Sequence, residues 1–433
     1  MATRFEPTGP LSGNLRPPAD KSISHRTALI AAMGEDVTEI EGYLDSADTR
    51  STLDAVQALG AEVEGVSPSG IEPVIRIQGI GLRSARSTPI DVGNAGTLLR
   101  LLPGWLAGQP GGRWTLDGDG SIRRRPVDRI AAPLRRMGAQ LSCREGRLPP
   151  LEVEAAPLQA IEYEMPIASA QVKSCLLFAA LLAEGETWLR EPARSRDHTE
   201  RMLAAAGADV VWLRGGIAVR PAKRLEPSEL AVPADFSSAA FFLVAALLVP
   251  GSEVTLEGVG NNPTRTGLLT ILERMGAEVE LEPVGERGGE PIGTLRVRAS
   301  ALCGTEVGGD EIPLAIDELP LVALAACFAE GETTIRDAAE LRRKESDRVA
   351  TTCAALEALG ASVEAREDGI RIEGGGGLRG GTISSHGDHR IAMLGAVAGL
   401  ASREGVTVEE MDAAAVSYPG FEADLASLAR RRS

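Results

Sequence analysis

Hydrophobic and polar positions follow two repeating patterns along this chain. Five times, a segment with apolar residues at helical spacing ends in Gly-Ala and is followed by residues that alternate between polar and apolar. A glycine just after a helix is typical of a left-handed C-terminal cap, and the alternation is typical of a half-buried strand. The pattern therefore predicts helix–turn–strand segments around five glycines: Gly60, Gly138, Gly207, Gly276 and Gly360.

A second pattern, a glycine followed by a short run of Thr or Val among apolar residues, occurs six times. It begins at Gly34, Gly111, Gly185, Gly251, Gly331 and Gly405. Six copies predict six similar α/β units. The last unit lacks the capped helix, and we expect the N-terminal strand to complete it. We therefore expect an α/β fold of two domains with three units each: a discontinuous domain of residues 1–20 plus 236–433, and an inserted domain of residues 21–235.

Composition narrows the possible functions. A chain of 433 residues that is 43% hydrophobic can bury more than one core. The formal net charge of −16 argues against nucleic acid or an anionic membrane as a partner. The longest apolar run, residues 239–249, is shorter than the roughly 20 residues of a membrane span. The five cysteines are scattered, which argues against a metal site or disulfide framework, and the start of the chain lacks a signal-peptide pattern. We expect a cytoplasmic protein.

The first basic motif, residues 20–26, lies between a Pro-rich strand and an apolar helix. Ser22 or Ser24 suits the N-cap, and the free N–H groups of a helix start attract phosphate. Lys21 and Arg26 add positive charge there. The alternative is an ordinary capped helix with solvated charges.

Three further motifs in the first half suit anions. Residues 93–97 place two glycines at a helix start, where the backbone can approach a ligand or simply turn. Residues 123–125 are three arginines in an acidic protein; we expect Arg125 at an anion, while Arg123 and Arg124 also fit a solvated surface. Residues 169–174 and 196–200 supply Ser, Gln and Arg for a phosphate and hydroxyl groups.

The second half repeats this arrangement. Residues 342–348 are expected to begin a helix with Lys344 and Arg348 one turn apart on the same face. Residues 387–390 begin another helix, and Asp317 and Glu318 precede a third that looks buried. Basic residues at helix starts in both domains indicate a cleft that draws two anions between them. Solvated helix faces, or a linear solenoid without a catalytic site, are the alternatives.

Six motifs in this order, DKSISHR, GNAGT, SAQVKS, RDHTE, RKESDR and DHR, resemble the 5-enolpyruvylshikimate 3-phosphate synthase family, in its bacterial subclass. The resemblance covers residues 11 to about 425. It implies a two-domain inside-out α/β barrel of six βαβαββ repeats. It also implies the transfer of the enolpyruvyl group of phosphoenolpyruvate to shikimate 3-phosphate through a tetrahedral ketal, in aromatic amino acid biosynthesis. The enzyme would be a monomer without metal or cofactor.

The resemblance also implies the site. Shikimate 3-phosphate would bind Lys21, Ser22, Arg26, Ser169, Ala170, Gln171, Arg196, Asp317 and Lys344. Phosphoenolpyruvate would bind Lys21, Gly96, Arg125, Gln171, Arg348 and Arg390. Asp317 would accept the proton of the sugar hydroxyl, and Glu345 with Lys21 would exchange protons at the methylene carbon.

Four positions depart from the enteric members of that family. Ser121 stands for an arginine, whose role we assign to Arg125, and Ala170 stands for a serine. Val416 stands for a lysine and Glu340 for an asparagine. These departures concern contacts, while the expected reaction stays the same.

Gly96 leaves room beside the expected phosphoenolpyruvate site, so we expect inhibition by glyphosate. A sister enzyme that transfers enolpyruvyl to UDP-N-acetylglucosamine is the nearest alternative, but the cysteine usual in its mobile loop is missing from residues 119–121. A non-catalytic anion-binding scaffold is the other alternative. The presence of Asp317 and Glu345 argues against it.

Overall fold

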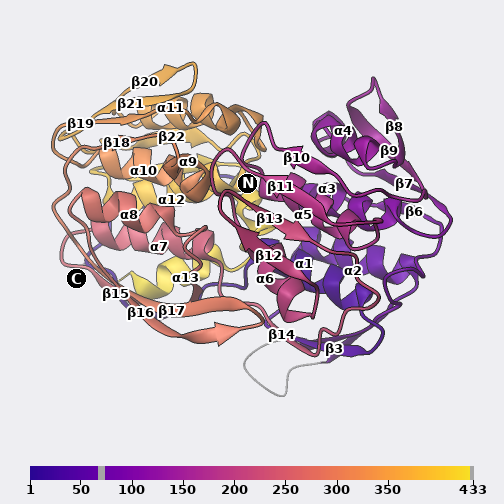
Figure 1. Cartoon of the computed structure of the whole chain (residues 1–433). Helices are drawn as coiled ribbons and strands as arrows, with labels where there is room; N and C mark the ends of the chain where they lie inside the picture. Colours follow the sequence, from indigo (N-terminus) through magenta and orange to yellow (C-terminus); the bar gives the residue numbers. More distant parts are fainter. Residues whose placement is uncertain (67–73, 430–433) are drawn as a thin grey trace. The chain divides into compact units, whose positions relative to one another are not determined.

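The computed structural model describes residues 1–66 and 74–429. They form two compact units (Figure 1). The terminal unit contains residues 1–18, 234–285 and 291–433, and the inserted unit contains residues 19–233 and 286–290. Among the described residues, no helix is long and apolar enough to cross a membrane.

In the part of the chain that the structure describes, the inserted unit contains three four-stranded sheets. In spatial order their strands are β14 (Glu229–Ala231), β3 (Val37–Glu41), β5 (Val74–Gln78) and β4 (Glu62–Val66); β6 (Pro89–Asp91), β7 (Arg113–Asp117), β9 (Leu148–Glu154) and β8 (Gln140–Arg144); and β10 (Glu162–Glu164), β11 (Thr187–Arg190), β13 (Gly216–Val219) and β12 (Val210–Leu213). Its helices are α1 (Lys21–Met33), α2 (Ala47–Leu59), α3 (Gly96–Ala107), α4 (Asp128–Arg136), α5 (Ala170–Ala180), α6 (His198–Ala205) and the 3-10 turn η1 (Ile122–Arg124).

The terminal unit has two four-stranded sheets and one of three strands among the described residues. Their strands are β16 (Glu278–Arg287), β17 (Glu290–Arg298), β15 (Glu253–Gly260) and β2 (Ser12–Leu15); β18 (Glu306–Val307), β19 (Glu332–Ile335), β21 (Gly369–Glu373) and β20 (Ser362–Arg366); and β1 (Thr3–Phe5), β23 (Val406–Glu409) and β22 (Gly381–Ser384). Its helices are α7 (Phe236–Leu248), α8 (Gly267–Arg274), α9 (Glu311–Ala315), α10 (Leu319–Ala326), α11 (Arg348–Ala358), α12 (His389–Ala401) and α13 (Phe421–Leu428), with 3-10 turns η2 (Ala339–Arg343) and η3 (Met411–Val416).

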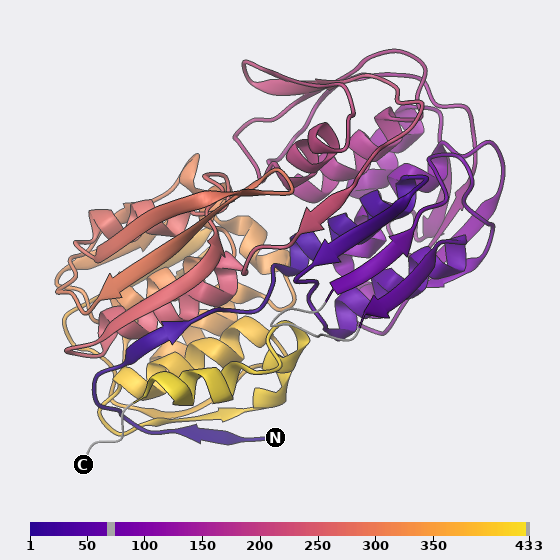
Figure 2. The same cartoon turned by 90° about the horizontal axis from the view of Figure 1, so that it is seen from below.

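The sheets repeat one topology, which confirms the prediction of six similar units. In the sheet of β14, β3, β5 and β4, the first pair is parallel and the next two pairs are antiparallel. In the sixth sheet β22 and β23 form the parallel pair, and β1 adds antiparallel to β23. Figure 2 shows this N-terminal strand beside the C-terminal strands. The expectation that the N-terminal strand completes the last unit is therefore confirmed.

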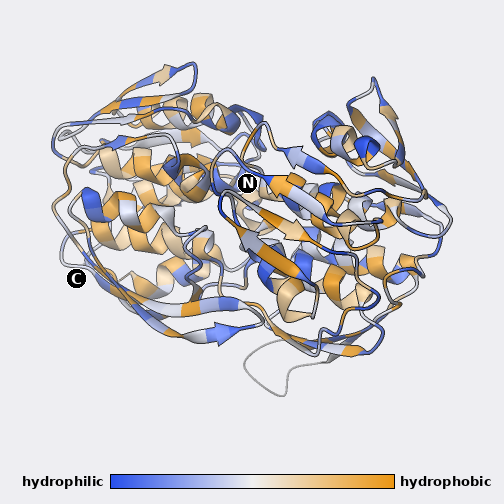
Figure 3. Ribbon diagram, viewed as in Figure 1, coloured by the Kyte–Doolittle hydropathy of each residue, from blue (hydrophilic) through white to orange (hydrophobic). Residues whose placement is uncertain are grey.

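Each repeat contributes one deeply buried helix. All residues of α7 and α10 are buried, and α1, α3, α5 and α12 are nearly as buried. Their sequences are rich in Ala and Leu and lack a polar face, as expected of helices covered on every side. Hydropathy colouring shows apolar residues along the packed helices as well as along many strands (Figure 3). These helices form the two cores and fix where their N-termini lie.

Helix ends follow the predicted glycine pattern. The five glycines of the first pattern all have positive φ, from 88° to 116°. A different glycine, Gly104, brings α3 close to α5, because a Cβ there would lie 1.9 Å from the carbonyl oxygen of Cys175. The close approach fixes the two helix N-termini that carry Gly96 and Gln171.

Candidate functional site

The first group of predicted residues lies at the start of α1. Asp20 is the N-cap and accepts a hydrogen bond from the Ile23 backbone N–H at 2.8 Å. The expectation of a serine cap was wrong: Ser22 lies within the helix, and the Ser24 hydroxyl donates to the Asp20 carbonyl oxygen. Aspartate caps a helix as well as serine does, so the motif leaves Ser22 available for other contacts. Lys21 is the first helical residue.

Lys21 pairs with a carboxylate of the same unit. Its Nζ lies 3.2 Å from Oδ2 of Asp48, on α2. Lys21 is about one-fifth exposed, while Asp48 is nearly buried. The pair holds a partly accessible cation at the N-terminal end of α1.

Arg26 is buried one turn further along α1. Its Nε donates to the Thr199 hydroxyl at 2.7 Å, and its Nη2 donates to Ser174 at 3.1 Å. Its Nη1 donates to the Ser22 carbonyl oxygen at 2.8 Å. Burial lowers the pKa of Arg26 to about 10, so the guanidinium remains charged at neutral pH. Arg26 thus joins motifs that lie about 150 and 170 positions away in the chain.

Sequence reasoning missed the role of Lys173. This buried lysine lies 2.6 Å from Glu191 and 2.7 Å from Glu200. Burial opposes its charge, but the two carboxylates outweigh that effect and raise the pKa of Lys173. Glu191 also accepts a hydrogen bond from the Ser195 backbone at 3.2 Å. Lys173 therefore anchors the loop that carries Arg196, and a lysine within an apolar helix was the available signal.

The starts of α3 and α5 meet through side chains. Gln171 donates to the Thr97 hydroxyl at 3.2 Å and accepts from Arg100 at 2.9 Å. Ser169 caps α5, and Ala170 is its first residue. These contacts bring the GNAGT and SAQVKS motifs together within the inserted unit.

Arg125 lies over Gly96. Its Nη2 donates to Asn94 at 2.8 Å and to Ser121 at 3.4 Å. A Cβ placed on Gly96 would lie 2.6 Å from Nη1 of Arg125. By contrast, Arg123 is half exposed and pairs with Asp117 at 2.7 Å, which fits a solvated surface residue. Arg125, the arginine predicted to bind an anion, is therefore the one that lies beside the glycine.

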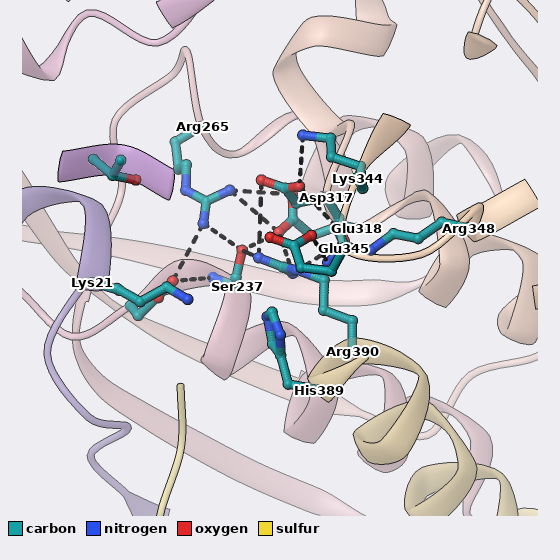
Figure 4. Close-up of polar contacts among 12 residues, drawn as sticks. Lys21, Ser237, Arg265, Asp317, Glu318, Lys344, Glu345, Arg348, His389 and Arg390 are labelled. Atoms are coloured by element: carbon teal, nitrogen blue, oxygen red, sulfur yellow. Dashed lines mark hydrogen bonds and ion pairs between the residues drawn. The ribbon is translucent and has the colours of Figure 1, made fainter. Parts of the chain in front are cut away.

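The second group of predicted residues lies in the terminal unit around Asp317 (Figure 4). Oδ1 of Asp317 lies 3.1 Å from Lys344 and 3.2 Å from Arg348, and Oδ2 lies 3.9 Å from Arg390. The expectation that Lys344 and Arg348 share a helix face was wrong, because α11 begins at Arg348, and Lys344 lies before it as the C-cap of η2 with extended backbone angles. They meet instead at one carboxylate oxygen.

Arg348 is almost fully buried among carboxylates. It donates to Asp388 through Nε at 2.8 Å and Nη2 at 3.2 Å, and also donates to Asp317 and Glu345. Burial alone would lower the pKa of Arg348, but Asp388 and Glu345 outweigh it and raise the pKa above its usual value. Asp388, the N-cap of α12, has its own pKa held below the usual value by Arg348, against the effect of burial. The guanidinium is fixed in both position and charge.

Arg390, one residue into α12, contacts residues that sequence reasoning did not assign. Its Nη1 lies 3.3 Å from Glu318 and donates to the Asp317 carbonyl oxygen at 3.0 Å. Its Nη2 donates to the Ser237 hydroxyl at 2.9 Å. Arg265, which precedes α8, lies 3.3 Å from both Glu318 and Asp235.

The repeat itself held the signal for these missed residues. Asp235 and Ser237 begin the buried helix α7 as Asp20 and Ser22 begin α1. Arg265 lies 11 positions before Gly276, and Arg196 lies 11 positions before Gly207, the corresponding glycine of another repeat. Aligning the units would have placed all three at helix starts.

The remaining predicted positions are partly accessible. Glu345 is 30% exposed and accepts from Arg348 at 2.6 Å. Ser22, Ser169 and Arg196 are half-buried. Of the departures, Glu340 lies in η2 and Val416 ends η3. Each unit thus gathers its own predicted residues, with basic and hydrogen-bonding side chains in the inserted unit and a mixed cation–carboxylate cluster in the terminal unit.

Comparison with known proteins identifies the family. The profile of EPSP synthase (3-phosphoshikimate 1-carboxyvinyltransferase) matches residues 5–425. The chain is 49% identical over 429 residues to the 3-phosphoshikimate 1-carboxyvinyltransferase of Gloeobacter violaceus, with 98% of each chain covered. It is 47% identical over 421 residues to that of Halorhodospira halophila, with 96% and 94% covered. A solved EPSP synthase from Acinetobacter baumannii superposes with a TM-score of 0.88 at 40% identity, covering 99% of this chain and 98% of that one. The chain therefore belongs to the EPSP synthase family.

Proposed function

We propose that this chain transfers the enolpyruvyl group of phosphoenolpyruvate to the 5-hydroxyl of shikimate 3-phosphate and releases phosphate, a step of the shikimate pathway to aromatic amino acids. The observation that carries the proposal is the Asp317 carboxylate, held by Lys344 and Arg348 with Arg390 beside it. A proton acceptor and two guanidinium groups suited to a substrate carboxylate meet there.

Anion binding divides between the two groups of residues. For shikimate 3-phosphate the proposal assigns the helix starts at α1 and α5 with Arg26, Arg196 and Lys344. For phosphoenolpyruvate it assigns Lys21, Gly96, Arg125, Gln171, Arg348 and Arg390. Backbone N–H groups and arginines suit phosphate oxygens, and the proposal requires both groups to act on one pair of substrates in a shared cleft.

The chemistry requires three proton transfers. The 5-hydroxyl oxygen bonds to C2 of phosphoenolpyruvate while Asp317 takes the hydroxyl proton and C3 gains a proton, giving the ketal. The C2–O bond to phosphate then breaks as C3 loses a proton, leaving the vinyl ether and free phosphate. Glu345, which is partly exposed, and Lys21 are assigned to C3. Proton transfer by positioned groups typically contributes about 10²–10⁴-fold in rate.

The proposal also takes the enzyme to be a cytoplasmic monomer that uses the two substrates without a cofactor. The net charge of −16 supports small anions, bound locally, over polyanionic partners. The molar mass of the purified protein, measured by light scattering, tests whether it is a monomer.

The test is phosphate release by the purified protein with both substrates, and with each omitted in turn. Release that requires both, and that Asp317→Ala abolishes, supports the proposal. Release with UDP-N-acetylglucosamine in place of shikimate 3-phosphate would point to the sister enzyme. No release with either acceptor would contradict the proposal and leave an anion-binding protein.

A further inference from the structure

A completely buried carboxylate lies directly beside the proposed base in the sequence. Glu318 has no exposed side-chain surface and accepts hydrogen bonds from three side chains. The donors are the Ser237 hydroxyl, Arg265 at 3.3 and 3.4 Å, and Arg390 at 3.3 Å. These residues come from the starts of α7, α8 and α12, so Glu318 joins three helix starts of the terminal unit (Figure 4).

Cations and carboxylates alternate in the cluster around Arg390. Arg265 lies between Asp235 and Glu318, and Arg390 lies between Glu318 and Asp317. Burying an ionised carboxylate is unfavourable unless paired charges and hydrogen bonds compensate it. A purely structural role would require only that compensation. It would not require one of the partners to be a predicted substrate ligand.

The hydrogen bonds of Arg390 have a direction. Nη1 donates to Glu318 and to the Asp317 carbonyl oxygen, and Nη2 donates to Ser237. Among the described residues, Nε of Arg390 has no hydrogen-bond acceptor. Since Nε–H and one Nη2–H form one edge of a guanidinium, an incoming carboxylate can bind that edge with both oxygens.

We infer that Glu318 is a positioning residue for phosphoenolpyruvate, and this inference rests on the proposed function. Glu318 and Ser237 hold Nη1 and Nη2 of Arg390, so that its Nε edge is presented to the substrate carboxylate. Arg265 fixes Glu318 from the opposite side. Glu318 does not touch the substrate itself, because it is buried behind the guanidinium.

The experiment compares steady-state kinetics of Glu318→Gln, Ser237→Ala and a control variant. Glu318→Gln keeps the shape and removes the charge, so Arg390 loses a charge-assisted partner. KM for phosphoenolpyruvate should rise by about 10- to 100-fold, while KM for shikimate 3-phosphate changes by less than about twofold. Ser237→Ala should raise the same KM by about 3- to 10-fold. Glu318→Asp, which keeps the charge, should recover part of the loss.

The matched control is Glu311→Gln in the same unit. Glu311, on α9, accepts two hydrogen bonds from Arg274, on α8, at 2.7 and 2.9 Å. Removing its charge should leave both KM values unchanged. If Glu318→Gln does not fold, Ser237→Ala and Glu318→Asp decide the question.

If the wild-type enzyme is active, either of two results would overturn the inference. One is a fall in kcat with unchanged KM for phosphoenolpyruvate. The other is an equal rise in both KM values together with a lowered unfolding midpoint, which indicates a general structural role. A wild-type protein that releases no phosphate would instead contradict the proposed function, so the two failures are distinguishable.

Discussion

Arg348 donates two hydrogen bonds to Asp388, through Nε at 2.8 Å and Nη2 at 3.2 Å, and both side chains are buried. This pair ties the start of α11 to the start of α12.

Asp388→Ala removes a carboxylate partner from the buried guanidinium of Arg348, and we expect a loss of about 3–5 kcal/mol in the free energy of unfolding. Asp388→Asn keeps an acceptor and should cost less. Urea unfolding of both variants measures the difference, and equal stability of Asp388→Ala and wild type would contradict the role assigned to the pair.

Gly96→Ala tests the contact between Gly96 and Arg125. The added Cβ would lie 2.6 Å from Nη1 of Arg125, so the guanidinium must move. We expect KM for phosphoenolpyruvate to rise by about tenfold, the scale of one hydrogen bond to a charged group, while KM for shikimate 3-phosphate is retained.

Glyphosate should inhibit the wild-type enzyme in competition with phosphoenolpyruvate and should inhibit Gly96→Ala less. Titrating both proteins with the inhibitor checks this expectation. Unchanged wild-type activity at millimolar glyphosate would show that Gly96 does not determine sensitivity here.

Lys173→Met tests the anchor of the Arg196 loop. Methionine fills the same volume but leaves Glu191 and Glu200 buried without their shared cation. We expect a lower unfolding midpoint and a rise in KM for shikimate 3-phosphate, with KM for phosphoenolpyruvate less affected. The opposite split between the two KM values would show that the loop does not serve the phosphate of shikimate 3-phosphate.

His25 gives the protein an acid-sensitive site. Its Nδ1 lies 2.6 Å from the Thr52 hydroxyl, Nε2 has no hydrogen-bond partner among the described residues, and burial lowers the pKa of the imidazole to about 3. As the pH falls, His25 is protonated near pH 6.5 in the unfolded chain, but only near pH 3 in the folded protein. The stability contribution of the neutral imidazole is therefore complete above pH 6.5. It falls by up to about 1.4 kcal/mol per pH unit between pH 6.5 and about 3.

His25→Asn should flatten this acid limb, because asparagine retains a polar group near Thr52 without titrating. Urea unfolding at pH 7 and pH 5 measures the slope for both proteins. Identical slopes for variant and wild type would rule out His25 as the cause.

The repeat pattern predicted most of the fold because glycines at regular positions mark the helix and strand boundaries of each unit. The capped glycines took positive φ as expected, and β1 completed the sixth sheet. The family match confirmed the fold class, the family and its reaction. The serine cap was wrong because Asp20, Ser22 and Ser24 are all good caps, and only the geometry selects among them.

Long-range partners were beyond the reach of the motifs. Ser237 and Arg265 lie in segments without a dense run of charges. Glu318 lies next to Asp317, and the sequence pattern does not distinguish the roles of the two carboxylates. Arg348 and Asp388 lie 40 residues apart and become neighbours only when α11 and α12 pack. The site roles of these residues remain predictions for the experiments above.

The most direct measurement is the structure of the product made from phosphoenolpyruvate labelled with carbon-13 at C3. After incubation with shikimate 3-phosphate and the enzyme, the label should appear by NMR as the methylene of a vinyl ether, in an amount equal to the phosphate released. Label in the methyl group of free pyruvate, with no ether formed, would show hydrolysis and contradict enolpyruvyl transfer.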